Sequence, residues 1–320
     1  MNLKTPVVLI IFNRPETTEK VFREIAKAKP SKLLVIADGP RESRPSDIKK
    51  CQETRNIIKK VNWDCEILTN YSEKNLGPRR RISTGLDWVF NQVEEAIILE
   101  DDILPHFSFF QFCEELLERY RYDKNIALIS GTNLQIVRRN SSYSYYFSRY
   151  PQIWGWASWR RFWKHYDVDL KLWPEFRETS WLEDILADKR TVYRYWKNVF
   201  DSVYQNKLNV WAYQVSFAMW VQGAMAVIPS INLVSNIGFG VGATNTRNKW
   251  HKFSNLKKFE MRFPLSHPPE ILRDKSIDKF VEKYSLTPFK PLLTRIFLFL
   301  FCWLRRCFVE QFCKKYKIKN

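Results

Sequence analysis

The turn that follows the first apolar stretch of the chain contains no glycine. It reads FNRPE at residues 12–16, whereas a dinucleotide-binding domain needs glycines there so that the backbone can approach a pyrophosphate. The sequence also lacks a G-x-x-x-x-G-K-[ST] loop and any glycine-rich basic loop of the kind that nucleotidyltransferases place after their first strand. These absences argue against NAD or FAD binding, P-loop chemistry and nucleotidyl transfer.

Cysteine motifs and a secretory signal are missing too. The six cysteines form no C-x-x-C pair and no metal-ligand spacing with histidine. The first residues lead into an apolar stretch without the pattern of a signal peptide. We therefore expect free thiols and a cytoplasmic protein.

Acidic residues are scarce relative to basic ones: 34 Asp and Glu stand against 52 Lys and Arg, a net charge of +18. No RNP, zinc-finger or helix-turn-helix signature accompanies this charge, so nucleic acid is not the expected partner. An anionic membrane surface or a phosphorylated substrate fits better.

The charge is most uneven in residues 290–320, which hold eight Lys and Arg and one Glu. Within them, residues 296–304 are all apolar, a run far shorter than the roughly 18–20 residues that span a bilayer. This pattern favours a basic amphipathic tail lying on the inner face of the cell membrane. The alternative is a C-terminal helix that packs on the domain.

Strand-like and helix-like segments alternate along the first hundred or so residues. Such alternation predicts an α/β fold built from βαβ units, with a mostly parallel sheet flanked by helices. The second half is less regular and richer in Tyr and Trp. The predicted strands are residues 7–12, 33–37, 65–69, 96–99, 126–130 and 226–228, with an extended stretch at 143–150; the predicted helices are 16–28, 46–58, 82–90, 109–120, 191–206 and 211–222.

Polar clusters follow four of the predicted strands: Asn13 with Arg14, Asp38 with Gly39, Asn75, and residues 100–102. Each alone is typical of an ordinary turn. The carboxyl ends of parallel strands meet at one edge of a sheet, where ligands of open α/β folds bind. Together the clusters predict a binding site at that edge.

Glu100, Asp101 and Asp102 end a strand whose last four residues are all apolar. Three adjacent carboxylates repel one another unless a cation lies among them. Mg²⁺ or Mn²⁺ binds one or two carboxylates together with phosphate oxygens. These acids therefore predict a metal site beside a phosphate-bearing substrate; a solvated acidic turn is the alternative.

Seven segments carry a resemblance to a known family. The sequence resembles glycosyltransferases of the GT-A fold over about residues 5–245, and it is most similar to the N-acetylglucosaminyltransferase I-like branch and its bacterial relatives. The segments are VVLIIFNRPE (7–16), VIADGP (35–40), NLG (75–77), GLDWVF (85–90), IILEDD (97–102), WGW (154–156) and the block 211–240.

The resemblance implies a metal-dependent transfer of a sugar, for example GlcNAc, with inversion. The donor would be a nucleotide diphosphate sugar, with a UDP-sugar first, and the acceptor a saccharide or lipid-linked saccharide in surface-polysaccharide synthesis. It also implies a nucleotide-sugar-binding half at residues 1–104, an acceptor half of the same domain at 105–265, and the tail at 266–320.

The resemblance further implies roles for single residues. Asp102, with Asp101 beside it, would bind the metal, and Glu100 and Asp101 would contact the ribose or the donor sugar. Asp38 would accept a hydrogen bond from the base. Asn13, Arg14, Gly39 and Asn75 would line the same pocket, one arginine of 79–81, with Arg79 first, would offset diphosphate charge, and Trp154 and Trp156 would form part of the acceptor site, core packing being the equal alternative for Trp156.

One residue departs from the pattern of the family. An inverting enzyme needs a carboxylate to take the proton of the acceptor hydroxyl, and the family places it in a W-D-D-like sequence where this chain has WAYQ (211–214). Ala212 cannot act as a base. Either Glu183, Asp184 or Asp201 serves, or the mechanism differs, or the chain is a catalytically silent relative that binds nucleotide sugar or glycan. His251 is expected to be a surface residue and not a metal ligand.

Overall fold

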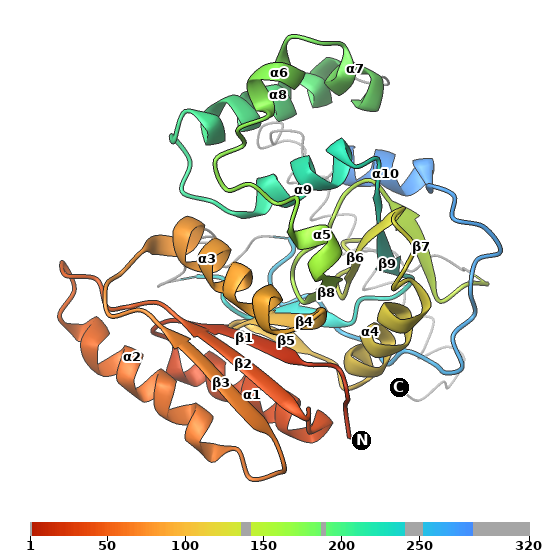
Figure 1. Ribbon diagram of the computed structural model, residues 1–320. Helices are drawn as coiled ribbons and strands as arrows, with labels where there is room; N and C mark the ends of the chain where they lie inside the picture. Colours follow the sequence, from red (N-terminus) through yellow and green to blue (C-terminus); the bar gives the residue numbers. More distant parts are fainter. Residues whose placement is uncertain (1, 136–141, 187–189, 241–251, 284–320) are drawn as a thin grey trace, which may run out of the picture.

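The computed structural model describes residues 2–135, 142–186, 190–240 and 252–283 (Figure 1). The predicted alternation of strands and helices is confirmed in the first hundred residues. The elements there are β1 (Val7–Ile11), α1 (Pro15–Ala28), β2 (Lys32–Ala37), α2 (Ser46–Asn56), the 3₁₀ turn η1 (Ile57–Lys60), β3 (Glu66–Tyr71), α3 (Gly77–Gln92) and β4 (Glu95–Glu100).

The second half adds shorter strands and most of the remaining helices. The elements are β5 (Ile103–Pro105), α4 (Ser108–Arg119), β6 (Ile126–Ser130), β7 (Tyr145–Ser148), β8 (Trp156–Trp159), α5 (Arg160–Trp163), α6 (Trp173–Arg177), α7 (Trp181–Leu186), α8 (Arg190–Tyr204), α9 (Ala212–Val221), β9 (Met225–Pro229), β10 (Val234–Asn236) and α10 (Lys275–Val281).

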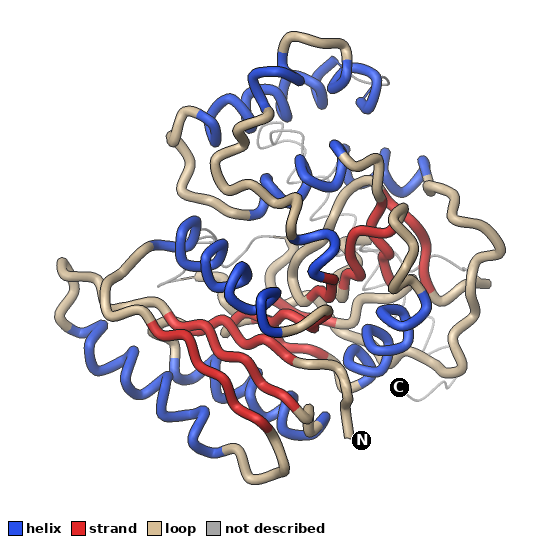
Figure 2. Tube along the Cα trace, viewed as in Figure 1, coloured by secondary structure: helices blue, strands red, loops and turns tan. Residues whose placement is uncertain are grey.

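Eight of the strands form one sheet in the order β3-β2-β1-β4-β8-β6-β9-β7. The pairs among β1 to β4, and the pair β6–β9, are parallel, while β8 runs antiparallel to both β4 and β6, and β7 antiparallel to β9. Figure 2 shows this sheet continuing through both halves of the chain, with helices on both faces. The predicted mostly parallel sheet flanked by helices is confirmed.

The sheet is buried because its central strands are apolar on both faces. All five residues of β1 are buried, as expected for a strand that helices cover on both sides. One face packs against α1 and α4 through Phe22 and Phe109, and the other packs against α3 and α9 through Leu86 and Met219.

One predicted boundary is corrected, and one strand of the sheet was not predicted. Helix α3 begins at Gly77, five residues before the predicted start, because Pro78 fits the first helical turn and needs no hydrogen-bond partner there. The strand β8 was not predicted. All four of its residues are buried, so it has none of the alternation that marks a half-exposed strand.

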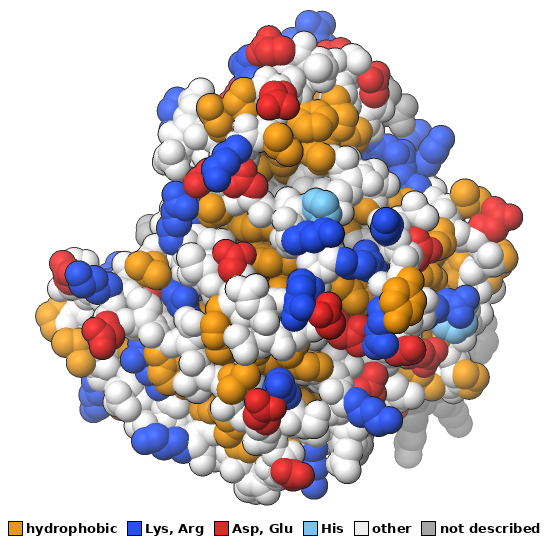
Figure 3. All heavy atoms as spheres, viewed as in Figure 1, with side chains coloured by type: hydrophobic (Ala, Val, Ile, Leu, Met, Phe, Trp, Pro, Cys, Tyr) orange, Lys and Arg blue, Asp and Glu red, His pale blue; other side chains and the backbone are white. Residues whose placement is uncertain are grey.

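Helices α6, α7 and α8 form a layer that stands apart from the sheet at the top of Figure 1. On the face that Figure 3 shows, apolar side chains gather over this layer. Leu172, directly before α6, and Tyr204, the last residue of α8, are exposed.

The start of the predicted tail packs on the sheet. In α10, Asp278 is buried and accepts a hydrogen bond of 2.6 Å from Ser148 of β7. The apolar run 296–304 lies outside the described residues. Among the residues that are described, no helix has both the length and the apolar character needed to cross a membrane.

Candidate functional site

The polar clusters that follow β1, β2 and β4 lie at one edge of the sheet, as predicted. Parallel pairing places Ile11 beside Ala37 and Ile10 beside Glu100. The residues that directly follow β1, β2 and β4 therefore lie side by side at the carboxyl edge of the sheet.

Arg14 joins the ends of β1 and β4. Its guanidinium donates a hydrogen bond to Asp102 Oδ2 and lies 3.5 Å from Asp101 Oδ1. Asp101 Oδ2 also accepts a hydrogen bond of 3.1 Å from the backbone N–H of Phe12. The side chains are partly buried, with 22% of Arg14 and 13% of Asp102 exposed. Two of the predicted acids thus share one cation supplied by the protein.

Burial makes this cluster electrostatically unusual. It raises the pKa of Glu100 to about 8, and the charges of Asp102 and Asp101 add to the rise. Burial also raises the pKa of Asp101 and Asp102, although Arg14 opposes the shift. For Arg14, burial favours a lower pKa, but Asp101 and Asp102 outweigh it and the pKa is raised. An additional positive charge bound here would stabilise the ionised form of these carboxylates.

The loop after β10 covers Asp102. The backbone N–H of Ile237 donates to the carbonyl oxygen of Asp102 at 2.9 Å. A Cβ atom on Gly238 would overlap the Asp102 carboxylate, so only glycine allows this approach. Sequence reasoning did not single out Gly238. The signal that could have found it is the spacing G-x-G-x-G at residues 238–242, of which 241 and 242 lie outside the described residues.

Asp38 organises the neighbouring loop. Its two oxygens accept hydrogen bonds from the backbone N–H groups of Gly39, Leu76 and Gly77 and from Asn75 Nδ2, all between 2.9 and 3.1 Å. These four donors fill the positions that a carboxylate offers. The predicted hydrogen bond from a base to Asp38 would have to displace one of them. Asn75 is likewise committed, since its Nδ2 also donates to Gly39 O.

Asn13 lies in a second polar group that the sequence did not predict. Its Nδ2 donates to Asp47 Oδ1 at 2.7 Å, and Asp47 accepts two hydrogen bonds from the Arg41 guanidinium. The Arg41 guanidinium lies 5.2 Å from the centre of the Phe12 ring. A flat aromatic face and polar side chains therefore meet beside Arg14.

The guanidinium of Arg79 is engaged in contacts other than the predicted one with a diphosphate. It is buried, and its guanidinium donates to Val168 O, Asp169 and Asn206. It thereby ties α3 to the segment before α6 and to the end of α8. Contact with a diphosphate would break these bonds, so Arg14 is better placed for that contact.

The two predicted acceptor tryptophans have different environments. Trp154 is half-buried, and its ring centre lies 5.7 Å from that of Phe239 in the loop that covers Asp102. Trp156 is only 1% exposed and packs on Trp163 and Trp211 in the core. Of the two alternatives for Trp156, the structure has core packing, because its ring has no face open to a sugar.

The predicted bases do not lie at the carboxyl edge. Glu183 and Asp184 are exposed on α7, which Figure 1 places far from the ends of β1 and β4. Asp201 accepts hydrogen bonds from Trp173 and Arg177. Burial favours a higher pKa for Asp201, but these bonds outweigh it and lower the pKa, which weakens a base. The structure therefore does not support these three assignments.

Comparisons with known proteins give limited similarity. No family model matches the sequence, and no curated protein matches it. A solved UDP-glucose pyrophosphorylase complexed with UDP-glucose is similar at 11% identity and a TM-score of 0.38, covering 71% of this chain and 90% of that chain. A 4-diphosphocytidyl-2C-methyl-D-erythritol synthase from Anaerococcus prevotii follows at 12% identity and a TM-score of 0.31, covering 54% and 84%. Similarity this low says nothing about function, which has to be inferred from the site.

The carboxylates fit a divalent cation only together with a substrate. In the described part of the chain, no three His, Cys, Asp or Glu side chains converge as a metal site. Mg²⁺ and Mn²⁺ in phosphate-binding sites need only one or two protein carboxylates, because phosphate and water complete the shell. Asp102 and Asp101 could supply these carboxylates once Arg14 releases the Asp102 carboxylate, with which it now pairs. His251 lies outside the described residues.

Proposed function

We propose that this chain is a glycosyltransferase that binds a nucleotide diphosphate sugar at the carboxyl edge of its sheet and transfers the sugar to a saccharide acceptor. The observation that carries the proposal is the cluster of Arg14, Asp101 and Asp102 at the ends of β1 and β4. It combines a guanidinium, which binds phosphate oxygens in a fork, with carboxylates that suit a divalent cation.

Each residue has a role under this proposal. Asp102, the more exposed of the two aspartates, would hold Mn²⁺ or Mg²⁺ with Asp101, and such an ion neutralises charge on the departing diphosphate. Arg14 would bind the diphosphate, while Phe12 and Asn13 line the place of the base. Trp154, next to the loop over Asp102, would offer its ring to the acceptor sugar. The basic residues 290–320 support contact with an anionic membrane.

A thermal-unfolding screen tests the donor half of the proposal. UDP-, GDP-, dTDP- and CMP-sugars are added with and without Mn²⁺. A ligand at about 100 times its Kd adds roughly 2.7 kcal/mol to the unfolding free energy. We expect a UDP-sugar to raise the Tm in the presence of Mn²⁺, and Asp102→Asn to remove the effect. Asp64→Asn, an exposed position before β3, is the matched control. A chain that responds to no nucleotide sugar contradicts the proposal.

The second candidate is a relative that binds nucleotide sugar without transferring the sugar. Ala212 favours it, because this residue opens α9 where the resembling family has an acid. Donor binding with neither donor hydrolysis nor a glycosylated product, across a panel of saccharide acceptors, would select this candidate.

A further inference from the structure

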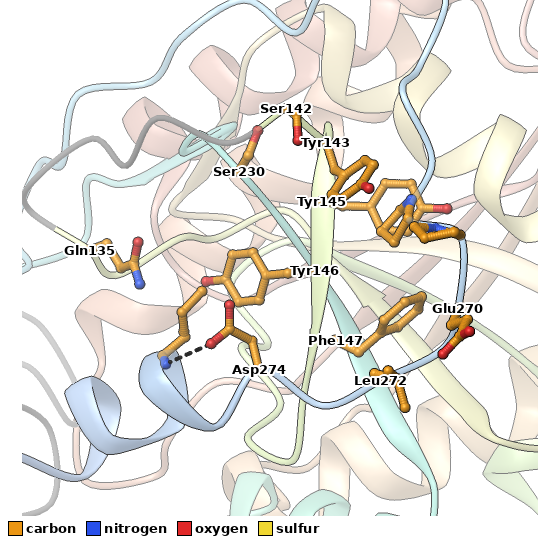
Figure 4. A pocket seen from close by; sticks show the side chains of 13 residues that line it. Gln135, Ser142, Tyr143, Tyr145, Tyr146, Phe147, Ser230, Glu270, Leu272 and Asp274 are labelled. Carbon is orange, nitrogen blue, oxygen red and sulfur yellow. Dashed lines mark hydrogen bonds between the residues drawn. The ribbon is translucent and has the colours of Figure 1, made fainter.

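A cavity of about 420 Å³ lies along β7, the last strand of the sheet (Figure 4). Its volume falls in the range of sites that hold small molecules, about 300–1,000 Å³. Strand β7 and the residues before it form one wall, and residues from the segment 268–277 form the other.

The chain builds this cavity with two backbone hydrogen bonds, one to the residue before β7 and one to β7 itself. At one point Ser144 N–H donates to Ser266 O, and at the other Asp274 N–H donates to Phe147 O, both at 2.8 Å. Between these points, Pro268 and Pro269 have no N–H with which to continue a strand pairing. The segment therefore arches away from the edge of the sheet and leaves a space.

The chemistry of the walls matches a neutral sugar. Figure 4 shows the rings of Tyr143 and Tyr146 at the cavity, together with the amide of Gln135 and the carboxylates of Glu270 and Asp274. Aromatic rings offer an apolar face with a polar edge. The amide of Gln135 and the carboxylate of Glu270 suit hydroxyl ligands, whereas Asp274 Oδ1 already accepts the hydrogen bonds that cap α10. Among the described residues that line the cavity, none is Lys or Arg. A phosphate group would meet the carboxylates of Glu270 and Asp274 without a Lys or Arg among the described lining residues to offset their charge.

The cavity lies at the same edge of the sheet as the candidate donor site. Ser230 and Gln135 line it, and they follow β9 and β6, which run in the same direction as β4 because β8 is antiparallel to β4 and β6. Four interstrand spacings of about 4.8 Å separate β4 from β7, roughly 19 Å in all.

Trp154 lies between the cavity along β7 and the candidate donor site. Thr132, three residues before Gln135, donates its hydroxyl to Trp154 O at 2.6 Å, and on its other side Trp154 packs on Phe239. A continuous row of residues thus connects the cavity with the loop that covers Asp102.

We propose that the cavity along β7 is a distal subsite for a saccharide. It holds one or more units of a neutral glycan, whose chain runs along the carboxyl edge past Trp154 to the donor site. The role as an acceptor subsite rests on the proposed function; the binding of a neutral saccharide does not. Such a subsite selects long acceptors over short ones.

The test measures binding without donor or metal. Short and long chito-, malto- and isomalto-oligosaccharides are titrated against the full chain. We expect one series to bind, with affinity rising with length. Tyr143→Ala and Gln135→Ala should each weaken binding of the long oligosaccharide about tenfold, the loss expected for one ring contact or one hydrogen bond. The control Tyr122→Ala, at a residue 90% exposed, should leave binding unchanged.

The outcomes separate the subsite from the donor site. A wild-type chain that binds none of the oligosaccharides overturns the subsite, and so does binding that neither Tyr143→Ala nor Gln135→Ala weakens while both variants keep the wild-type Tm. If transfer occurs, the two variants should raise the KM of a long acceptor and leave that of a short acceptor and the kcat unchanged. Oligosaccharide binding without any response to nucleotide sugars would support the glycan site and overturn the proposed function.

Discussion

Arg14 donates a hydrogen bond to Asp102 across the ends of β1 and β4. A positive charge that belongs to the protein thus lies where a substrate-bound cation is expected. It keeps two partly buried carboxylates from facing each other without compensation. The ion pair also competes with the proposed ligands, because Arg14 would leave Asp102 to bind the diphosphate and Asp102 would leave Arg14 to bind the metal ion.

Replacing Arg14 tests this competition. Arg14→Ala should lower the affinity for a nucleotide diphosphate sugar at least about tenfold, since charge-assisted hydrogen bonds to phosphate are lost. It should also lower the unfolding free energy by roughly 2–3 kcal/mol, because the carboxylates of Asp101 and Asp102 lose the guanidinium that offsets their charge. Titration calorimetry and urea unfolding measure the two effects. Arg14→Lys should restore stability more than affinity, because an ammonium lacks the fork; equal loss of affinity in the exposed control Arg44→Ala would contradict the assignment.

A methyl group at position 238 should disturb Asp102. In Gly238→Ala the new Cβ overlaps the Asp102 carboxylate, so this side chain has to move. We expect the Mn²⁺-dependent Tm shift by a UDP-sugar to fall by half or more. Gly223→Ala is a useful contrast: its Cβ meets nothing within 4 Å, but its φ is +62°. That variant should lose about 1 kcal/mol of stability through backbone strain and keep the Tm shift.

The pH dependence of stability should reveal the buried acids. Because burial raises the pKa of Glu100 to about 8, the folded state binds more protons than the unfolded chain between about pH 4 and that value. The contribution of Glu100 to the unfolding free energy therefore falls as the pH rises. Glu100→Gln removes this titration, so the unfolding free energy of the variant should rise relative to that of the wild type by roughly 3 kcal/mol between pH 5 and pH 8. Urea unfolding at both pH values measures the difference; a constant difference would contradict the raised pKa.

Replacing either tryptophan of the WGW segment by alanine should affect a different property, stability for Trp156 and sugar transfer for Trp154. Trp156→Ala removes a ring that is 1% exposed and should cost about 3–5 kcal/mol of stability. Trp154→Ala should leave donor binding and the Tm near wild-type values and weaken transfer to a saccharide. Thermal unfolding and product formation, measured on the same preparations, distinguish the two. A large loss of stability in Trp154→Ala would show that this ring serves the core.

The parallel part of the sheet could be predicted from the sequence alone. Continuous apolar runs such as 7–11 and 96–99 can be buried only between two helical layers, and the helices between them have one apolar face. The polar clusters at Asn13, Asp38 and residues 100–102 could also be placed at one edge, because parallel strands end on the same side.

The partners of those polar side chains could not be read from the sequence. Asp38 lies at the predicted edge, but its four hydrogen bonds depend on the exact path of the loop at 75–77. Arg79 follows the same loop and turns to the segment at 168–169 instead, because α3 begins earlier than its apolar residues indicate.

By itself, then, the sequence determined the layer order and the edge at which the polar residues gather, since both follow from local patterns that repeat along the chain. Only the tertiary structure decided which cation faces Asp102, which tryptophan is core, and that a proline-containing arch encloses a cavity beside β7. The pair Arg14–Asp102 joins residues 88 apart, and the contact of the arch between Ser144 and Ser266 joins residues 122 apart. Short sequence patterns contain no information about contacts of that range.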